Sequence, residues 1–369
     1  MTKVLLFSHE FPPKVGGAGM VAYDIANSLT KKNIQVTAVT NNYKNSKAII
    51  NSGFRHLEVK ILPKMGPYFY WKKLKEMNMG DYDKIIINDI GAALTASLFF
   101  PVSIQKKSII YLHGSEPEKI FKSPSVFFRI LKFKKRYIKL LNNAHSIVAV
   151  SEYMKNKMYP FLKDSSASKK VKVIYNGINL DEYEFLKTDI RNKYNIGMNK
   201  KIILSAGRVV VGKGYKEMYE IFRDLLKQGF DYHWILVGDG DYLRELKRLS
   251  LGDNINTSMT FVGKLERREL NYFYSAANIF WSLSNYEESL GLVYIESIAS
   301  GTPVIARKKG GALEVITEKT GYLIENNDEC LKLLKTVQFK KLSLNTVNEA
   351  LEKFNLENNI NELIGLIKT

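Results

Sequence analysis

Two glutamates in the C-terminal half have the spacing and chemistry of a sugar-nucleotide site. Glu288 follows the apolar run 279–283, which we expect to be a strand, and Glu296 lies along a helix expected to begin near Gly291. An ionised carboxylate only accepts hydrogen bonds, so both groups suit vicinal hydroxyls of a sugar or ribose. Amides at a helix start near Gly291 and Leu292 suit a diphosphate. The structural alternative makes Glu288 a charge favourable to the helix dipole and Glu296 part of a solvated face.

Two cations follow the first predicted strand of the same half. Arg208 and Lys213 lie in the run 207–214, which begins and ends with glycine and follows the strand 202–205. A guanidinium binds phosphate oxygens as a fork, and a lysine adds a compact charge. Position and glycines therefore favour a diphosphate, and the alternative is a loop with two solvated cations.

The N-terminal half offers weaker signals. Gly16 and Gly17 follow the predicted strand 4–7 and precede a helix, but their spacing matches neither a dinucleotide fingerprint nor a Walker loop, so a plain strand–helix turn is the alternative. His113 ends the predicted strand 108–113. The four other histidines are scattered, so we expect no metal cluster, and the alternative for His113 is a strand-end residue hydrogen-bonded to backbone.

Two Asp-x-Asp runs, 81–83 and 239–241, resemble the metal-binding motif of another class of transferase. The first precedes a predicted strand and the second opens a predicted helix. Strand-end and capping roles therefore explain them better, and we expect a metal-independent protein without a cofactor.

Strands and helices alternate along the whole chain, which indicates parallel sheets covered by helices on both faces. We expect a first helix over 21–29, a single helix over 129–141, and further helices over 215–226, 242–250 and the tail after 343. The expected strands are 4–7, 35–40, 84–88, 108–113, 146–150 and 171–175, then 202–205, 234–237, 259–262, 279–283 and 302–306.

The two series of strands predict an α/β protein with two doubly wound domains facing each other across a deep cleft. The expected domains are 1–180 for the acceptor, 181–345 for the donor, and a helical tail, 346–369, that crosses back to the first domain. Ligands of such sheets bind at the carboxyl ends of the strands, where the residues above are expected.

Composition is that of a soluble globular protein, with 45% hydrophobic and 25% charged residues among 369. The single Cys330 fits a reducing compartment. No apolar run approaches the roughly 20 residues that span a bilayer, and the N-terminus reads as a strand rather than a signal peptide. We therefore expect a cytoplasmic protein.

The formal net charge of +18 is uneven, because residues 1–190 contain 30 basic and 15 acidic side chains. Aromatic and basic residues mix in the segments 68–75 and 127–137. Such segments suit peripheral contact with an anionic membrane surface on the inner face of the cell membrane. The alternative is amphipathic helices with apolar sides in the core and lysines in water.

These residues together resemble family 4 glycosyltransferases, which are retaining enzymes of the GT-B fold. Glu288 and Glu296 match the family's E-x7-E motif. Further matching motifs, in the family's order and spread over the chain, are Gly16-Gly17, His113-Gly114, Asn176-Gly177, Gly207-Arg208, Lys213-Gly214, Gly238-Asp239, Val262-Gly263, Gly301-Thr302-Pro303 and Gly310-Gly311.

The resemblance implies a role for each matching residue. Glu288 would contact donor-sugar hydroxyls and Glu296 the ribose, while Arg208 and Lys213 would hold the diphosphate. His113 would lie near the reacting sugar. The remaining donor contacts would come from Gly16 and Gly17 and from loop residues Val262, Lys264, Ser289, Leu290, Gly291 and Leu292.

The implied reaction moves a hexose-type sugar from a UDP- or GDP-linked donor to a hydroxyl of a glycan acceptor, expected to be lipid-linked, in bacterial surface polysaccharide synthesis of the O-antigen or capsule type. One alternative is a sugar-nucleotide 2-epimerase of the same fold. The other is a basic nucleic-acid-binding protein, for which no reading motif is found, so we expect no nucleic acid partner.

Overall fold

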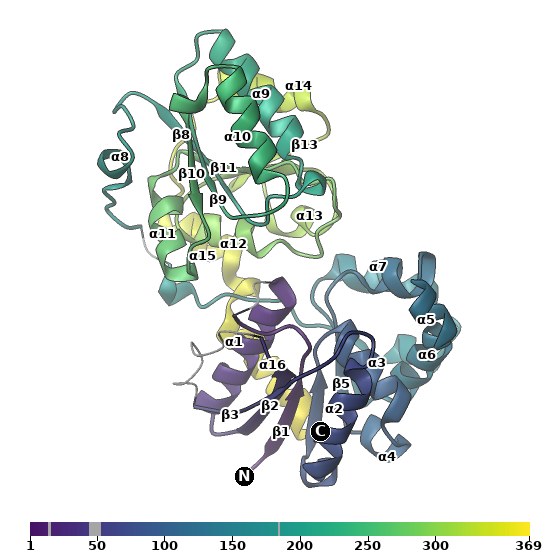
Figure 1. The fold of residues 1–369 in the computed structure, drawn as a ribbon. Coiled ribbons are helices and arrows are strands. Elements are labelled where there is room, and N and C mark those ends of the chain that lie inside the picture. Colours follow the sequence, from purple (N-terminus) through teal and green to yellow (C-terminus); the bar gives the residue numbers. More distant parts are fainter. Residues whose placement is uncertain (14–15, 44–52, 184) are drawn as a thin grey trace. The chain divides into compact units, whose positions relative to one another are not determined.

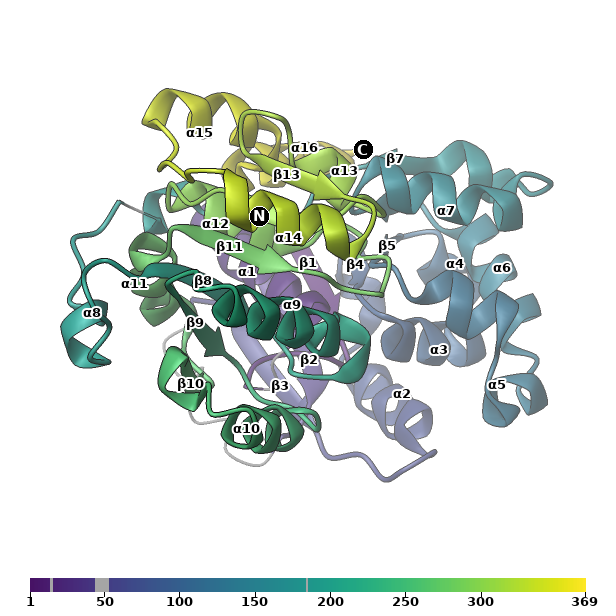
Figure 2. The same ribbon diagram turned by 90° about the horizontal axis from the view of Figure 1, so that it is seen from above.

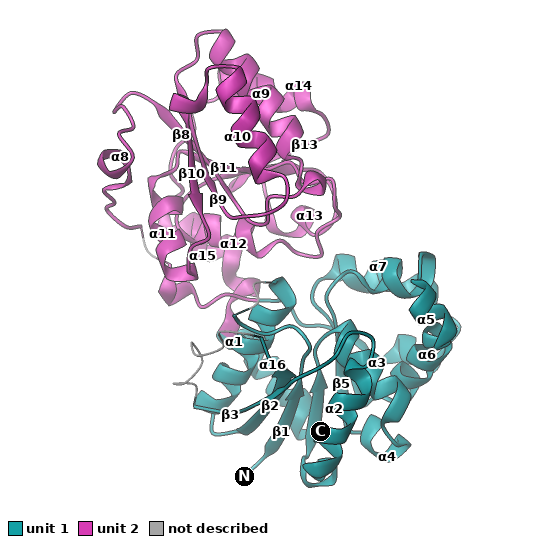
Figure 3. Ribbon diagram, viewed as in Figure 1, with its two compact units in different colours: residues 1–176, 357–369 teal, residues 177–356 magenta. Residues whose placement is uncertain are grey.

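The computed structural model describes residues 1–13, 16–43, 53–183 and 185–369 (Figure 1). The chain divides into two compact units (Figure 3). Unit 1 comprises Met1–Asn176 and Glu357–Thr369, and unit 2 comprises Gly177–Leu356. The sequence-based limits 1–180, 181–345 and 346–369 stay proposals for functional domains. Lys14 and Val15, in the predicted loop before Gly16, lie outside the described residues.

Unit 1 is built on a parallel sheet whose described strands follow the order β3-β2-β1-β4-β5-β6-β7. Their bounds are β1 Lys3–Phe7, β2 Gln35–Asn41, β3 Arg55–Val59, β4 Lys84–Ile87, β5 Ser108–Leu112, β6 Ser146–Ala149 and β7 Val171–Val173. The sequence analysis missed β3, because this edge strand is mostly half-buried and lacks an apolar run.

The helices of unit 1 lie between and beside these strands. They are α1 Gly17–Lys31, α2 Gly66–Glu76, α3 Ile90–Phe99, α4 Val102–Gln105, α5 Val126–Ile130, α6 Phe133–Asn143, α7 Glu152–Leu162 and α16 Leu356–Lys368. The single helix expected over 129–141 is wrong: Lys132 adopts a left-handed conformation, with φ of 49°, and separates α5 from α6.

The last helix, α16, belongs to unit 1 except for its first residue (Figure 3). Leu363 on this helix is fully buried, and Glu357 pairs with Lys32 at the end of α1, with 2.5 Å between Nζ and Oε1. The side chain of Thr369 lies 3.2 Å from His145 Nε2. Unit 1 is therefore assembled from both ends of the described chain.

Unit 2 is built on a second parallel sheet, with described strands in the order β10-β9-β8-β11-β12-β13. They are β8 Lys201–Ala206, β9 Tyr232–Val237, β10 Met259–Gly263, β11 Ile279–Ser282, β12 Val304–Arg307 and β13 Gly321–Ile324. The short edge strand β13 was missed, since three of its four residues are only half-buried. The other five confirm the predicted strands to within two residues.

The helices of unit 2 alternate with its strands along the chain. They are α8 Ile190–Lys193, α9 Tyr215–Lys227, α10 Leu243–Gly252, α11 Arg267–Ala276, α12 Leu292–Ala299, α13 Ala312–Val315, α14 Asn327–Thr336 and α15 Leu344–Leu351. Helices α9 and α14 lie side by side and bury Phe222, Leu225 and Leu334 against Trp234 and Trp281 of the sheet (Figure 2). Both sheets thus hold the loops after their strands on a packed core.

Candidate active site

Lys213 and Glu288 form an ion pair at the carboxyl ends of β8 and β11. Lys213 Nζ contacts Glu288 Oε1, and the two side chains are 23% and 25% exposed. Ser284 Oγ donates to the same carboxylate oxygen over 3.0 Å. The structure therefore brings together a cation and a carboxylate that the sequence analysis placed in one site, although 75 residues separate them.

Backbone packing fixes the loops that carry this pair. Gly214, with φ of 75°, lets the chain pass so close to β11 that a Cβ there would lie 1.9 Å from the Leu283 carbonyl oxygen. Gly310, with φ of 62°, similarly lies against the backbone of Glu288, and Gly311 N donates to the Glu288 carbonyl oxygen over 2.7 Å. The position of Glu288 is thus set by main-chain contacts with two other loops.

The start of α12 lies three residues after Ser289. Gly291 precedes it with φ of 84°, no side chain caps the first amides, and the first turn contains no acidic residue. Leu290 is buried, with 2% of its surface exposed. Leu292 begins the helix, and the open amides and the helix dipole at this point favour an anion.

Other predicted donor-binding residues lie after neighbouring strands of the same sheet. Arg208 is exposed directly after β8. Val262 is half-buried in β10, and the Gly263 carbonyl accepts from Gly238 N over 2.8 Å. The side chain of Lys264 is 70% exposed and lies 3.7 Å from Asp239. These residues share an edge of the sheet, but no side-chain bond joins them to Glu288 in the described part of the chain.

Glu296 is clamped inside unit 2 by residues that the sequence analysis did not select. Its side chain is only 9% exposed. Arg267 Nε donates to Oε1 over 3.2 Å and to the Tyr183 hydroxyl over 2.8 Å, and the Tyr274 hydroxyl donates to Oε2 over 3.1 Å. Burial and, to a smaller extent, the Glu296 carboxylate raise the pKa of the Tyr183 and Tyr274 hydroxyls far above the usual range for tyrosine. Both hydroxyls therefore keep their protons and can donate hydrogen bonds. A solvated face for Glu296 is therefore wrong.

Lys341 connects Tyr274 to a neighbouring segment through two hydrogen bonds. Lys341 Nζ donates to Thr302 Oγ1 over 2.5 Å and to the Tyr274 carbonyl oxygen over 3.2 Å. Burial lowers the pKa of Lys341 to about 8. Thr302 Oγ1 also bonds the Tyr274 carbonyl, at 2.6 Å, so the end of α11 that carries Tyr274 is tied to the segment after α12.

The corresponding arrangement in unit 1 surrounds His113, directly after β5. Its Nε2 lies 3.0 Å from Asn88 Oδ1, while Asn88 Nδ2 donates to Ser8 Oγ over 3.0 Å and to the Ala18 carbonyl over 2.9 Å. Because the amide nitrogen faces the Ala18 carbonyl, its oxygen must face the imidazole, and we infer that Nε2 carries the proton. The alternative of a backbone-bonded histidine also holds, because His113 hydrogen-bonds the backbone of Asn88 as well as its side chain.

His113 is neutral at ordinary pH. Burial lowers its pKa to about 4, against the smaller opposing effects of Asp89 and Asn88. The carboxylate of Glu116 accepts from His113 N over 3.0 Å and from Gly114 N over 2.7 Å. Burial also raises the pKa of Glu116. Asn88 therefore holds the imidazole and Glu116 holds its backbone, while Ser8 and Ala18 hold Asn88 in turn.

Gly16 and Gly17 stand at the start of α1 in the same unit. Gly16 is the N-cap, with extended backbone and no side-chain cap, and no acidic residue lies in the first turn. A Cβ on Gly16 would lie 2.6 Å from Glu10 Oε2, whereas the space around Gly17 is open. Within the part of the chain that the structure describes, no side chain caps the start of α1, as at α12, and such a helix start favours an anion.

One aspartate of each Asp-x-Asp run accepts a hydrogen bond from a backbone amide. Asp83 Oδ2 accepts from Lys3 N over 2.8 Å, and Asp239 Oδ1 accepts from Gly240 N. A capping role for the second run is wrong, since α10 begins at Leu243 after Tyr242. Among the described residues, no three His, Cys, Asp or Glu side chains gather in a way that could hold a metal ion. Metal independence stays a proposal.

Two family models match consecutive parts of the chain. The model described as Glycosyltransferase Family 4 matches residues 15–182, and the model described as Glycosyl transferases group 1 matches residues 187–337. The chain belongs to glycosyltransferase family 4.

A solved relative shares the fold of this family 4 glycosyltransferase over its whole length. The Anabaena protein Alr3699/HepE, solved in complex with UDP and glucose, superposes with a TM-score of 0.82 at 18% identity and covers 100% of both chains. At this identity the likeness shows the fold alone, which is GT-B with two Rossmann-like sheets.

Two curated relatives of the family 4 chain act on lipids by name. The alpha-monoglucosyldiacylglycerol synthase of Streptococcus pneumoniae is 31% identical over 185 residues, which are 48% of this chain and 41% of that protein. The GDP-mannose-dependent alpha-(1-6)-phosphatidylinositol monomannoside mannosyltransferase of Mycolicibacterium smegmatis is 23% identical, covering 88% of this chain and 86% of its own length. The first match thus spans less than half of the relative.

Several residues of the two sites escaped the sequence analysis of this family 4 chain. Asn88 comes directly after β4 at the carboxyl end of the strand, so the rule that selected His113 could have found it. Arg267 and Tyr274 lie on α11, and Tyr183 lies in the connection before α8. No spacing in the sequence links these three to Glu296, because tertiary packing brings them together.

Proposed function

We propose that this family 4 glycosyltransferase transfers a hexose-type sugar from a UDP- or GDP-linked donor to a hydroxyl of a glycan acceptor, with retention of the anomeric configuration. The observation that carries the proposal is the contact between Lys213 and Glu288 beside the open start of α12. A cation, a carboxylate and free amides at one edge of a sheet match the phosphate and hydroxyl groups of a sugar nucleotide.

Stabilising the departing diphosphate is the main chemical demand of this reaction. Arg208, Lys213 and the amides at Gly291 and Leu292 supply positive charge at fixed positions, and such preorganised groups are worth most where charge develops. Glu288 accepts from the hydroxyls of the donor sugar and Glu296 from those of the ribose. No metal enters the proposed mechanism, and we expect full activity in excess chelator.

The acceptor-side role is assigned to His113 and to the start of α1. The imidazole is neutral and its orientation is fixed by Asn88, so it can lie against the reacting sugar without adding a charge. No carboxylate of the chain is proposed as a nucleophile. Instead, a donor phosphate oxygen takes the proton from the attacking acceptor hydroxyl.

We further propose that the acceptor is a lipid-linked glycan in bacterial surface polysaccharide synthesis. The protein would bind this acceptor at an anionic membrane surface. On α5, Val126 and Ile130 are 61% and 73% exposed beside the exposed Arg129. Helix α6 instead buries Phe133 and Tyr137, and α2 buries Tyr70 and Leu74, as amphipathic core helices do. We therefore restrict the proposed membrane contact to α5.

Membrane attachment of this kind is peripheral. Across the described residues, no helix combines the length and the apolar character that a membrane crossing requires. Sedimentation with phosphatidylglycerol vesicles at moderate salt tests the contact. We expect binding that falls in Val126→Asp and Ile130→Asp, and the absence of any binding by the native protein contradicts it.

The central experiment is a donor screen followed by an acceptor assay. UDP-, GDP- and ADP-sugars are tested for protection against heating, and the best donor is then assayed with lipid-linked glycans. We expect protection by a UDP- or GDP-sugar and transfer to one acceptor. Conversion of the donor sugar without any acceptor would instead identify a 2-epimerase, and tight binding to random oligonucleotides without donor turnover would indicate a nucleic-acid-binding protein.

A further inference from the structure

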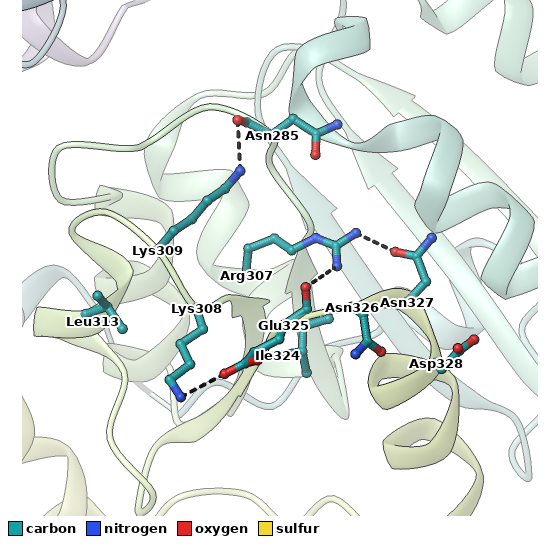
Figure 4. Close-up of a pocket in the computed structure, with 10 residues that line it drawn as sticks. All are labelled: Asn285, Arg307, Lys308, Lys309, Leu313, Ile324, Glu325, Asn326, Asn327 and Asp328. Atoms are coloured by element: carbon teal, nitrogen blue, oxygen red, sulfur yellow. Dashed lines mark hydrogen bonds and ion pairs between the residues drawn. The ribbon is translucent and has the colours of Figure 1, made fainter.

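A pocket opens in unit 2, at the carboxyl ends of β12 and β13 (Figure 4). Its volume is about 810 Å³, within the range of about 300–1,000 Å³ that is usual for small-molecule sites. All its lining residues lie between Asn285 and Asp328. None of them was selected in the sequence analysis, and the donor-binding roles proposed above use none of them.

The pocket shares a wall with the loop that holds Glu288. Asn285, three residues before Glu288, lines the pocket, and Lys309 on the other side donates to the Asn285 carbonyl oxygen over 2.8 Å. Lys309 directly precedes Gly310 and Gly311, which pack on the backbone of Glu288. A ligand in this pocket therefore lies next to the proposed donor-sugar loop.

Two cations of the pocket are bonded only by neutral oxygens. Arg307 donates to the Glu325 carbonyl oxygen over 3.4 Å and to the side-chain oxygen of Asn327, and Lys309 donates to a carbonyl as described. Within the described ranges neither cation has a carboxylate partner, whereas Lys308 pairs with Glu325 at 3.0 Å. Figure 4 shows these groups around one hollow. Their remaining hydrogen-bond capacity faces solvent or a ligand.

The lining is mixed in sign and in hydrogen-bonding character. Glu325 and Asp328 are exposed carboxylates that oppose a phosphate, while Arg307 and Lys309 oppose a free cation. A hydroxyl both donates and accepts, so a ligand rich in hydroxyls satisfies both kinds of group at once. Leu313 is 51% exposed at the edge and offers an aliphatic surface to the C–H face of a sugar ring.

We propose that this pocket binds a second segment of the glycan acceptor, at sugars beyond the one that receives the transferred hexose. The inference rests on the proposed function and adds the substrate class: an acceptor with several sugars is preferred over one with a single sugar. The pocket has room for more than one pyranose ring, and its donors and acceptors suit neutral sugars.

The test compares one acceptor series in two lengths. The acceptor identified in the donor–acceptor screen is used with one sugar and with four sugars. Leu313→Trp fills the pocket, Lys309→Ala removes a donor, and Leu251→Trp on α10, also exposed in unit 2, is the matched control. We expect KM for the long acceptor to rise about tenfold in Leu313→Trp, because ground-state binding is lost, and severalfold in Lys309→Ala.

Three readouts separate this inference from the proposed function. KM for the donor, slow donor hydrolysis without acceptor, and KM for the one-sugar acceptor should stay unchanged in both variants and in the control. If Leu313→Trp and Lys309→Ala are both active and keep the native KM for the long acceptor, the proposal that this pocket binds the acceptor is wrong. Loss of donor hydrolysis in both shows damage to the donor loop and equally overturns it.

If the native protein transfers to no acceptor, the proposed function fails and the pocket is tested by binding. Saturation-transfer NMR is then recorded with maltotetraose and mannotetraose against glucose and mannose. Binding of a tetrasaccharide that disappears in Leu313→Trp but persists in Leu251→Trp supports the pocket. No difference between native protein and Leu313→Trp overturns it.

Discussion

The sites of the two units are built from different interactions. Around His113 in unit 1, the Asn88 side chain contacts an uncharged imidazole, and the carboxylate of Glu116 accepts hydrogen bonds from two backbone amides. In unit 2, each selected glutamate meets a cation: Glu288 contacts Lys213, and Glu296 contacts Arg267. The uncharged imidazole brings no charge of its own to a ligand, whereas an ion pair can exchange one partner for a phosphate or a hydroxyl of the ligand.

The two ion pairs of unit 2 also differ from each other. The pair at Glu288 is about a quarter exposed and lies on loops, while the pair at Glu296 is nearly buried and reinforced by two tyrosines. We infer that Lys213 can turn toward a diphosphate, whereas Arg267 stays and positions Glu296. Exposed pairs contribute little stability, so the first pair is more valuable for chemistry than for folding.

The largest effect is expected for Glu288→Ala. Removing a group that acts on the reacting sugar should lower kcat by about 100- to 1,000-fold. Steady-state assays with the best donor measure this, and circular dichroism checks the fold. The surface pair Lys319–Glu349 supplies the control, because Glu349→Ala changes only an exposed contact. Full activity of Glu288→Ala would remove Glu288 from the mechanism.

Lys213→Ala comes next in size. It removes one of the charges that meet the departing diphosphate and leaves Glu288 without its cation, so we expect kcat to fall by about 100-fold. Lys319→Ala, which breaks the matched surface pair, should leave the rate unchanged. Because the variant loses a cation that contacts the diphosphate, the donor should also protect Lys213→Ala less against heating than it protects the native protein. Protection equal to that of the native protein would argue against a phosphate contact of Lys213.

At the site around His113, Asn88→Ala should lower kcat by about tenfold, because His113 loses the partner that fixes its ring. KM for the donor should change little. Asn143→Ala, which breaks a side-chain bond to Gln105 elsewhere in unit 1, is the control for simple destabilisation. A rise in donor KM with unchanged kcat would place Asn88 in donor binding instead.

The pH dependence sharpens the same contrast. With its pKa lowered to about 4, folded His113 binds fewer protons than the unfolded chain, whose histidines titrate near about 6.5. The free energy of unfolding contributed by His113 therefore falls as pH drops from about 6.5 to 4. Asn88→Asp places a carboxylate beside Nε2, so the acid limb of kcat should move to higher pH. An unmoved limb contradicts the assigned contact.

The smallest effect is expected for Tyr274→Phe. One hydrogen bond to Glu296 is lost while Arg267 remains, so KM for the donor should rise about three- to tenfold with kcat nearly unchanged. Tyr272→Phe, on the same helix and 48% exposed, is the matched control. A fall in kcat without a change in KM would assign Glu296 to the transition state rather than to binding.

The sequence was sufficient for the fold and for placing Lys213 and Glu288, which are in contact, in one candidate site. Apolar runs and glycines located the buried strands and the loops after them, so Lys213 and Glu288 could be placed in one site before any contact was known. Edge strands β3 and β13 escaped because half-buried residues leave no apolar run. Arg267, Tyr183 and Glu116 escaped because their roles depend on side-chain packing across the fold, which no spacing encodes.

The hydrogen bond from Gly311 N to the Glu288 carbonyl oxygen, together with the close backbone packing of Gly310 and Gly311, joins the segments 284–291 and 307–311 into one structural unit. If only one of these segments were replaced by the corresponding segment of a relative, the backbone contacts between the two segments would be lost. Chimeras designed to alter donor choice should therefore transplant both segments together, and libraries that randomise one of them should hold Gly310 and Gly311 constant.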